Sequence, residues 1–153
     1  MQEASKGADP AAQLVSAFRL DRQVSHILRR AHRRASALFA DQFDGLNLTP
    51  TQFAILAKLH ERREVSHNHL GRMTAMDPAT VQGVIRRLLT RALIQQRSDP
   101  NDRRRVLLSL TDAGRAVVEQ ALPMARHSAE LVVTSLKTEE RQELVRLLRK
   151  LLD

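Results

Sequence analysis

Two short amphipathic segments, joined by a tight connection in the middle of the chain, constrain its fold more than any other feature. Ser66 precedes the first segment, residues 67 to about 75, and can cap it. Asp77 caps the second segment, which runs from Pro78 to about residue 91, and proline is favoured at a first helical position. Two short helices joined in this way have the proportions of a helix-turn-helix.

The second of these helices is expected to have one apolar and one polar face. Its apolar side chains recur at i, i+3, i+4 and i+7, and they are Val81, Val84, Ile85 and Leu88. Gln82 and Arg86 lie one turn apart on the other face, and their side chains suit adenine and guanine edges respectively. Gly83 disfavours a helix by about 1 kcal/mol relative to alanine. It could allow close approach to a groove wall or close packing against another helix, and both explanations stay open.

A basic hairpin is predicted directly after this helix. Strand-like stretches at 94–97 and 106–110 flank a polar segment, residues 98–105, that carries three consecutive arginines. Guanidinium groups on such a ribbon can reach phosphates or an adjacent minor groove. Asp102 is expected to pair with Arg104 along the same strand face and so to hold the tip in place.

Longer amphipathic helices are predicted on both sides of this central part. One runs from near residue 14 to about residue 44, and Thr49 with Gln52 forms the capping box of the next. Thr111 can cap a long helix after the hairpin, and a last helix follows Thr138. The predicted fold class is therefore mainly α, a winged helix-turn-helix with a two-stranded β wing and helices at both ends.

Composition narrows the range of possible functions. Residues 58–110 contain eleven Lys and Arg but five Asp and Glu, so a polyanion would meet a local basic surface. The chain has no cysteine, which excludes disulfides and thiol catalysis. No apolar run approaches about 18 residues and the first ten residues are polar and small, so we expect a cytoplasmic protein without a membrane partner, associated with the nucleoid when bound to DNA. No nucleophile elbow, phosphate loop or spaced acid pair indicates an enzyme, and no cofactor is expected.

Two alternatives of the same fold remain open at this point. Six histidines, among them His67 and His69, allow a zinc-responsive regulator, although no cysteine or dense carboxylate cluster accompanies them. A winged helix can also be a protein-interaction module. The charged face around Arg86 argues against that module, because the centres of protein interfaces are depleted in charge.

Two motifs resemble the MarR (multiple antibiotic resistance regulator) family. Residues 99–111 read D-P-N-D-R-R-R-V-L-L-S-L-T and are similar to that family's wing signature, and residues 48–56 read L-T-P-T-Q-F-A-I-L. The resemblance covers roughly residues 18 to 152. It implies a homodimer that is usually a repressor, binds an inverted-repeat operator in double-stranded DNA and is released by a small aromatic carboxylate. Ala92 departs from the family, which commonly has glycine there, so the end of the preceding helix is uncertain.

The resemblance and the residue patterns together assign sites. DNA binding is assigned to Ser66, Ala79, Thr80, Gln82, Gly83, Arg86, Arg87, Asp102, Arg103, Arg104 and Arg105. Intersubunit packing is assigned to Leu14, Val15, Phe18, Leu144, Leu147, Leu148 and Leu151. Effector binding is assigned to Arg19, Arg22, Gln23, His26, Arg30, Gln52, His67 and His69, with no metal ligand.

The expected organisation is a single domain with a short tail. Residues 1–12 are predicted to be a flexible tail and residues 13–153 one MarR-type domain, in which residues 46–111 bind DNA. Dimerisation helices are expected at about 13–44 and 112–152. The stretches at 20–31 and 65–72 also look like the MarR subgroup that controls nicotinate degradation, which implies a hydroxylated pyridine carboxylate as the effector.

Overall fold

The computed structural model describes residues 18–102 and 104–152. The chain divides into two compact units, of which the first ends at Arg34 and the second begins at Ala35, and each is described by itself. The predicted tail, Leu14, Val15 and Arg103 lie outside the described residues, so the expectations for them stay predictions.

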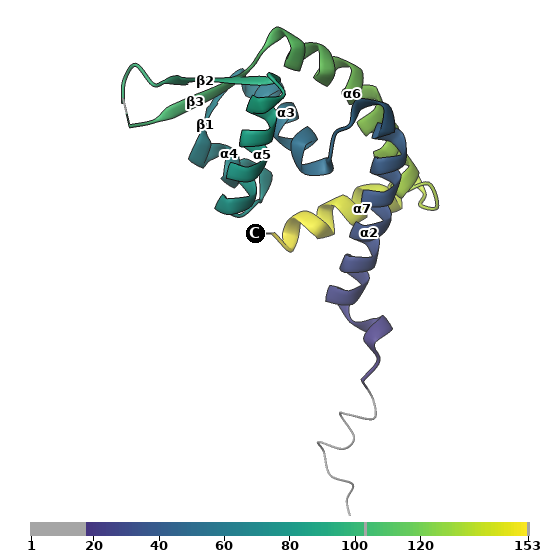
Figure 1. Ribbon diagram of the computed structural model, residues 1–153. Helices are drawn as coiled ribbons and strands as arrows, with labels where there is room; N and C mark the ends of the chain where they lie inside the picture. The colour runs from purple at the N-terminus through teal and green to yellow at the C-terminus, as the bar shows by residue number, and fades with distance from the viewer. Residues whose placement is uncertain (1–17, 103, 153) are drawn as a thin grey trace, which may run out of the picture. The chain divides into compact units, whose positions relative to one another are not determined.

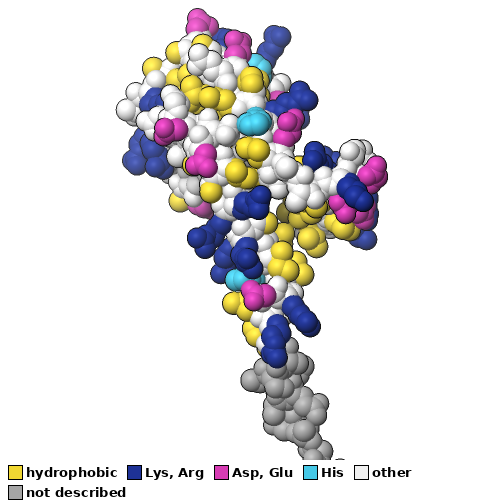
Figure 2. All heavy atoms as spheres, turned by 90° about the vertical axis from the view of Figure 1, so that its right-hand side faces the viewer, with side chains coloured by type: hydrophobic (Ala, Val, Ile, Leu, Met, Phe, Trp, Pro, Cys, Tyr) yellow, Lys and Arg dark blue, Asp and Glu magenta, His cyan; other side chains and the backbone are white. Residues whose placement is uncertain are grey.

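The first unit contains a 3-10 turn and the start of a helix. The turn is Leu20–Arg22, and the helix α2, Val24–Phe43, continues into the second unit. The predicted uninterrupted helix is wrong within the described residues, because Gln23 is extended with φ −77° and ψ 124°. Apolar periodicity continues through a single extended residue and therefore cannot reveal the break. Figure 2 shows hydrophobic side chains among Lys and Arg side chains on the segment next to the grey residues.

The core of the second unit is built around α3, Pro50–Arg62. Its capping box forms as predicted, with the Gln52 backbone N donating to Thr49 Oγ1 at 3.2 Å and the Thr49 backbone N donating to Gln52 Oε1 at 3.0 Å. α3 buries its apolar face completely, and that face consists of Ile55, Leu56 and Leu59. It contacts α4, α5, α6 and the sheet strands β1 and β3, so it lies at the centre of this packing.

The predicted helix-turn-helix is present. Helix α4 is His67–Thr74 and helix α5 is Pro78–Thr90, with three residues between them. Ala75 begins the connection in a left-handed conformation, φ 52°. Ser66 stands at the N-cap of α4, but its side chain makes no capping hydrogen bond in the described structure, so its predicted capping role is wrong. Ser66 is also the last residue of a short strand, where it is paired with Leu107.

The predicted hairpin belongs to a larger antiparallel sheet. Strands β2, Ile94–Ser98, and β3, Val106–Leu110, form the wing, which projects beyond the helices in Figure 1. A third strand, β1, Glu64–Ser66, pairs with the other edge of β3 and was not predicted. Three residues are too few to display an alternation of period two, so tertiary pairing rather than local pattern makes this segment a strand.

Helix α5 ends in a Schellman motif. The Leu93 backbone N donates to the Leu88 carbonyl at 3.0 Å, and the Ala92 backbone N donates to the Leu89 carbonyl at 2.9 Å. Ala92 holds the left-handed position of this motif with φ 52°. An alanine there has a Cβ close to its own carbonyl, which disfavours the conformation. The family's usual glycine would fit without this steric conflict, and the helix nevertheless ends where glycine would end it.

Ala92→Gly is therefore expected to stabilise the protein. Left-handed backbone disfavours alanine by roughly 1 to 2 kcal/mol, and the greater freedom of glycine in the unfolded chain offsets part of that gain. The expected rise in unfolding free energy is about 0.5 to 1 kcal/mol, measured by urea denaturation. Ala79→Gly, in the helical part of α5, is the control and should lower stability by a similar amount. A less stable Ala92→Gly variant would contradict the strain argument.

Two helices complete the second unit. Helix α6, Asp112–Val132, is capped by Thr111, whose Oγ1 accepts from the Gly114 backbone N at 3.0 Å. Helix α7, Thr138–Lys150, leaves apolar side chains exposed, and they include Leu144, Leu147, Leu148 and, just after the helix, Leu151. Among the described residues, none of the helices combines the length and apolarity that a membrane crossing requires.

Candidate nucleic-acid interface

The start of α5 is fixed by an aspartate cap. Asp77 Oδ1 accepts from the Thr80 backbone N at 2.9 Å, and the Thr80 hydroxyl donates to Oδ2 of the same carboxylate. These hydrogen bonds hold the pKa of Asp77 below its ordinary 3.8, so the cap carries its negative charge at the positive end of the helix at neutral pH. Thr80, which we predicted to contact DNA, therefore has its hydroxyl engaged in fixing the helix.

The two predicted faces of α5 are separated as expected. The apolar set is buried and comprises Val81, Val84, Ile85 and Leu88. The opposite face is exposed, with Gly83 half-buried among Ala79, Thr80, Gln82, Arg86 and Arg87. Because neighbouring elements cover only the first face, the second remains open for an external partner.

Gly83 resolves one of the open alternatives. A Cβ built on it would meet the Arg87 guanidinium at 3.3 Å, and among the described residues no atom of another helix lies within 4 Å of it. The idea that this glycine permits tight packing against another helix is therefore wrong. Arg87 lies back along the helix, with Nε donating to the Gly83 carbonyl at 3.1 Å. Gly83 thus leaves a shallow place on the exposed face.

Two aspartates organise the wing tip. Asp102 Oδ1 accepts from both the backbone N and the Nε of Arg104, at 3.1 and 3.4 Å, which confirms the predicted pair. The pair lies in the loop rather than on a strand face, so that detail of the prediction is wrong. Asp99 is nearly buried, accepts from the Asn101 backbone N at 2.9 Å and lies 3.9 Å from Arg105 Nη1. The Arg104 side chain, 92% exposed, stays available at the tip.

The polar face of α5 and the wing border a common surface. His67, at the start of α4, and Gln96, on β2, both line a hollow with Gln82 and Arg86 of α5. The same two residues line a second hollow whose other side chains are Ser66, Asn68, Arg72, Arg104, Arg105 and Val106. Because the two hollows share His67 and Gln96, the polar face of α5 and the arginine-tipped loop face the same side of the molecule.

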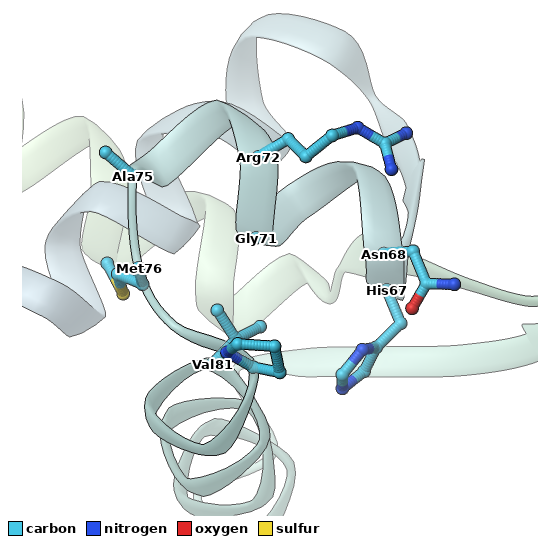
Figure 3. Close-up of a pocket in the computed structure, with 8 residues that line it drawn as sticks. His67, Asn68, Gly71, Arg72, Ala75, Met76 and Val81 are labelled. Carbon is cyan, nitrogen blue, oxygen red and sulfur yellow. The ribbon is translucent and has the colours of Figure 1, made fainter.

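A third hollow lies between α4 and α5 and also includes His67. It has a volume of about 480 Å³, and Figure 3 shows Gly71 and Arg72 on one wall with Val81 on another. Asn68 and Arg72, one helical turn apart, belong to the shared surface but were not predicted. Their i, i+4 spacing on α4 was a usable signal, whereas Gln96 offered none because strand exposure depends on tertiary packing.

The residues predicted for effector binding are divided between the two units. Arg19, Arg22, Gln23, His26 and Arg30 belong to the first unit, where Asp21 Oδ1 lies 3.6 Å from both His26 Nε2 and Arg30 Nη1. In the second unit Gln52 is buried and its Oε1 accepts from the Thr49 backbone N in the capping box, and its role in effector binding stays a prediction. His67 lines the shared surface, and His69 is exposed on α4. Across residues 18–102 and 104–152, histidine and carboxylate side chains form no cluster of three or more.

A helix-turn-helix with an exposed polar second helix, flanked by a β wing, defines a winged helix-turn-helix protein. The family model described as "MarR family" matches residues 48–106. The HTH-type transcriptional repressor NicR of Pseudomonas putida is 40% identical over 131 residues, which cover 86% of this chain and 83% of NicR. The chain belongs to the MarR family.

Two solved structures resemble both the sequence and the fold. A probable transcriptional regulator from Pseudomonas aeruginosa is 47% identical, with a TM-score of 0.84 over 87% of this chain and 99% of that one. BpsR of Bordetella bronchiseptica, studied for the regulation of its DNA binding by 6-hydroxynicotinic acid, is 40% identical with a TM-score of 0.85. That match covers 89% of this chain and 97% of BpsR.

Proposed function

We propose that this protein is a transcriptional repressor that binds an inverted-repeat operator in double-stranded DNA and is released by a small aromatic acid. The observation that carries the proposal is the surface shared by α5 and the wing, on which Gln82, Arg86 and Arg104 face the same side. The similarity to the repressor NicR supports the regulatory role and speaks against an enzyme. The protein would act in the cytoplasm, where its operator lies.

In this proposal the two basic features take different parts of the duplex. Helix α5 enters the major groove, where Arg86 can pair with a guanine edge and Gln82 with an adenine edge. The half-buried Gly83 would let the groove wall approach the helix backbone. Arg104, held at its root by Asp102, would reach the adjacent minor groove or its phosphates. Ser66, Ala79, Arg87, Arg103 and Arg105 would border these contacts.

Substitutions at the two features are expected to weaken DNA binding in different ways. Arg86→Ala should weaken operator binding by about 1 to 3 kcal/mol and relax the preference at one base pair, because a bidentate base contact is lost. Arg104→Ala should weaken binding evenly across sequences and reduce the salt dependence by about one phosphate contact. Footprinting on the region upstream of the gene, followed by titration at several salt concentrations, measures both effects. Parent-like binding by both variants would contradict the assigned surface.

We also propose that two copies assemble through their terminal helices. The described candidates are exposed in the single chain, namely Phe18, Leu144, Leu147, Leu148 and Leu151, and Leu14 and Val15 would join them. A groove on α7 combines Leu144 and Leu147 with three glutamates, whereas α2 carries arginines between its apolar residues. Opposite charges around apolar stripes favour pairing of such helices. A two-fold dimer sets the two α5 helices about 34 Å apart, one DNA turn.

The proposed effector is a hydroxylated pyridine carboxylate. BpsR is regulated by 6-hydroxynicotinic acid, and this chain is 40% identical to BpsR. Titrating 6-hydroxynicotinic acid into the operator complex should release the DNA, with benzoate as the matched control that lacks the ring nitrogen and hydroxyl. No release at millimolar 6-hydroxynicotinic acid would exclude this effector while leaving the DNA-binding proposal intact. His26→Ala and Arg30→Ala test the first-unit residues, and His69→Ala tests the second unit.

A further inference from the structure

One ion pair crosses the sheet from β2 to β1. Arg97, on β2, donates to both oxygens of Glu64, on β1, from Nε at 2.7 Å and from Nη2 at 2.6 Å. Strand β3 lies between β1 and β2, so the side chains span the outer face of a whole strand. Glu64 also raises the pKa of the Arg97 guanidinium through these hydrogen bonds. The bidentate arrangement fixes the orientation of both groups.

Glu64 and Arg97 each lie next to a connection between elements of the DNA-binding region. Glu64 is the first residue of β1 and directly follows Arg63, the C-cap residue of α3, which has a positive φ of 64°. Two residues later β1 leads into α4, so Glu64 marks the junction between α3 and the helix-turn-helix. Arg97 is one residue from the end of β2, immediately before the loop that carries Arg104. The pair therefore links the root of the wing loop to that junction.

Among the described residues, the other ion pairs of the wing do not make this link. Asp99 with Arg105 and Asp102 with Arg104 join residues of the same loop. They shape the tip, but they leave its direction relative to α5 undetermined. An exposed ion pair contributes little to global stability because water and salt screen it. Glu64–Arg97 can nevertheless bias the direction of the outer end of the hairpin, because β1 pairs only with residues 107–109 of β3 and the loop extends beyond that pairing.

We propose that the Glu64–Arg97 pair positions the wing so that Arg104 meets the DNA while α5 occupies the major groove. Arg97 is then a positioning residue, and its charge is used within the protein rather than on a phosphate. The inference rests on the proposed DNA-binding function.

The direction in which Glu64→Gln changes operator affinity distinguishes a positioning role from a simple effect of charge. Removing a negative charge favours binding to a polyanion, so a surface acid without a positioning role would give equal or tighter operator binding when neutralised. The proposal predicts the opposite, a loss of about three- to tenfold, because the wing is released. Arg97→Gln should show a similar loss, and the double variant should be no weaker than either single one.

Controls distinguish positioning from general damage. Glu61→Gln removes the same charge from an exposed pair on α3, where Glu61 meets Lys58 at 2.7 Å, and should not weaken binding. The Glu64→Arg, Arg97→Glu exchange should restore most of the affinity. In an Arg104→Ala background Glu64→Gln should have little further effect, whereas thermal melting should stay within about 2 °C of the parent throughout.

The outcomes that would contradict the positioning role differ from the outcome that would contradict the proposed DNA-binding function. Equal or tighter binding by Glu64→Gln, or losses that add in the double variant, would overturn the positioning role. Hydrogen exchange of the free protein provides a reading without DNA, and Glu64→Gln should speed exchange in the wing strands β2 and β3 but not in α5. Unchanged exchange in those strands would also overturn the inference. If the parent binds no duplex but Glu64→Gln still speeds exchange in β2 and β3, the result would contradict only the proposed DNA-binding function.

Discussion

Gly114→Ala is expected to lower the free energy of unfolding by at least about 3 kcal/mol. A Cβ on Gly114 would lie 1.8 Å from the Leu93 carbonyl oxygen and 2.8 Å from its carbon, so the new methyl would meet backbone rather than a flexible side chain. The backbone at Leu93 cannot easily move away. Its carbonyl accepts from the Thr111 backbone N at 3.2 Å, and the Thr111 hydroxyl donates to the Ala92 carbonyl at 2.7 Å.

The expected damage is specific because the same turn holds several elements together. Leu93 connects the end of α5 to β2, and Thr111 connects β3 to α6, so the clash would separate the reading helix from the wing and from α6. Urea unfolding of the variant measures the loss. Gly45→Ala is the matched control, since among the described residues beyond its chain neighbours no atom lies within 4 Å of a Cβ built there, and it should change the unfolding free energy by less than about 0.5 kcal/mol. Parent-like stability of Gly114→Ala would show that α6 does not pack on Leu93 as described.

Local signals explain why much of the fold could be predicted. The caps at Thr49, Asp77 and Thr111 each form the expected hydrogen bond to the backbone N three residues later. A cap and the apolar period that follows it are short-range features, so they can be read without tertiary information. The hairpin was found for a similar reason, because the polar loop interrupts two strand-like stretches.

The missed features depend on distant partners. Strand β1 exists because β3 offers it an edge, and the break at Gln23 interrupts an apolar pattern that continues on both sides. Arg91 donates from Nη1 to the Asn47 carbonyl at 2.8 Å, a contact between residues far apart in the sequence that joins the end of α5 to the segment before α3. Long-range contacts of this kind leave no periodic trace in the sequence.

In the candidate site too, the features set by local pattern could be predicted and those set by distant partners could not. The polar face of α5 followed from the helical period, and the Asp102–Arg104 pair followed from the need to offset charge beside an arginine tip. The sequence could not decide whether Gln52 caps α3 or binds the effector, because its side chain suits both roles, and in the structure it forms the cap. The wing's direction depends on Glu64 and Arg97, which are 33 residues apart.

Leu148→Glu is expected to dissociate the proposed dimer and to reduce operator affinity by at least about 100-fold. Leu148 lies on the apolar stripe of α7 and is 37% exposed in the single chain, so a charge there should not unfold the subunit. Inside an intersubunit core the same carboxylate would be buried without a partner, which strongly disfavours assembly. Light scattering after size exclusion should then show a monomer at micromolar concentration, where we expect the parent to be a dimer.

The loss of DNA affinity should exceed the loss of any single contact because half of the interface disappears. In a dimer the second α5 helix binds its half-site at a high effective concentration, whereas a monomer holds one half-site with one set of phosphate contacts. Gln142→Glu adds the same charge to an exposed polar position of α7 and should leave both the dimer and the affinity unchanged. A dimeric Leu148→Glu variant with parent affinity would place the intersubunit contact elsewhere, and a monomeric parent would contradict the dimer itself. In the proposed dimer, α5 of each subunit binds one half-site. An inverted-repeat operator therefore predicts that Leu148→Glu abolishes the dimer and tight operator binding together.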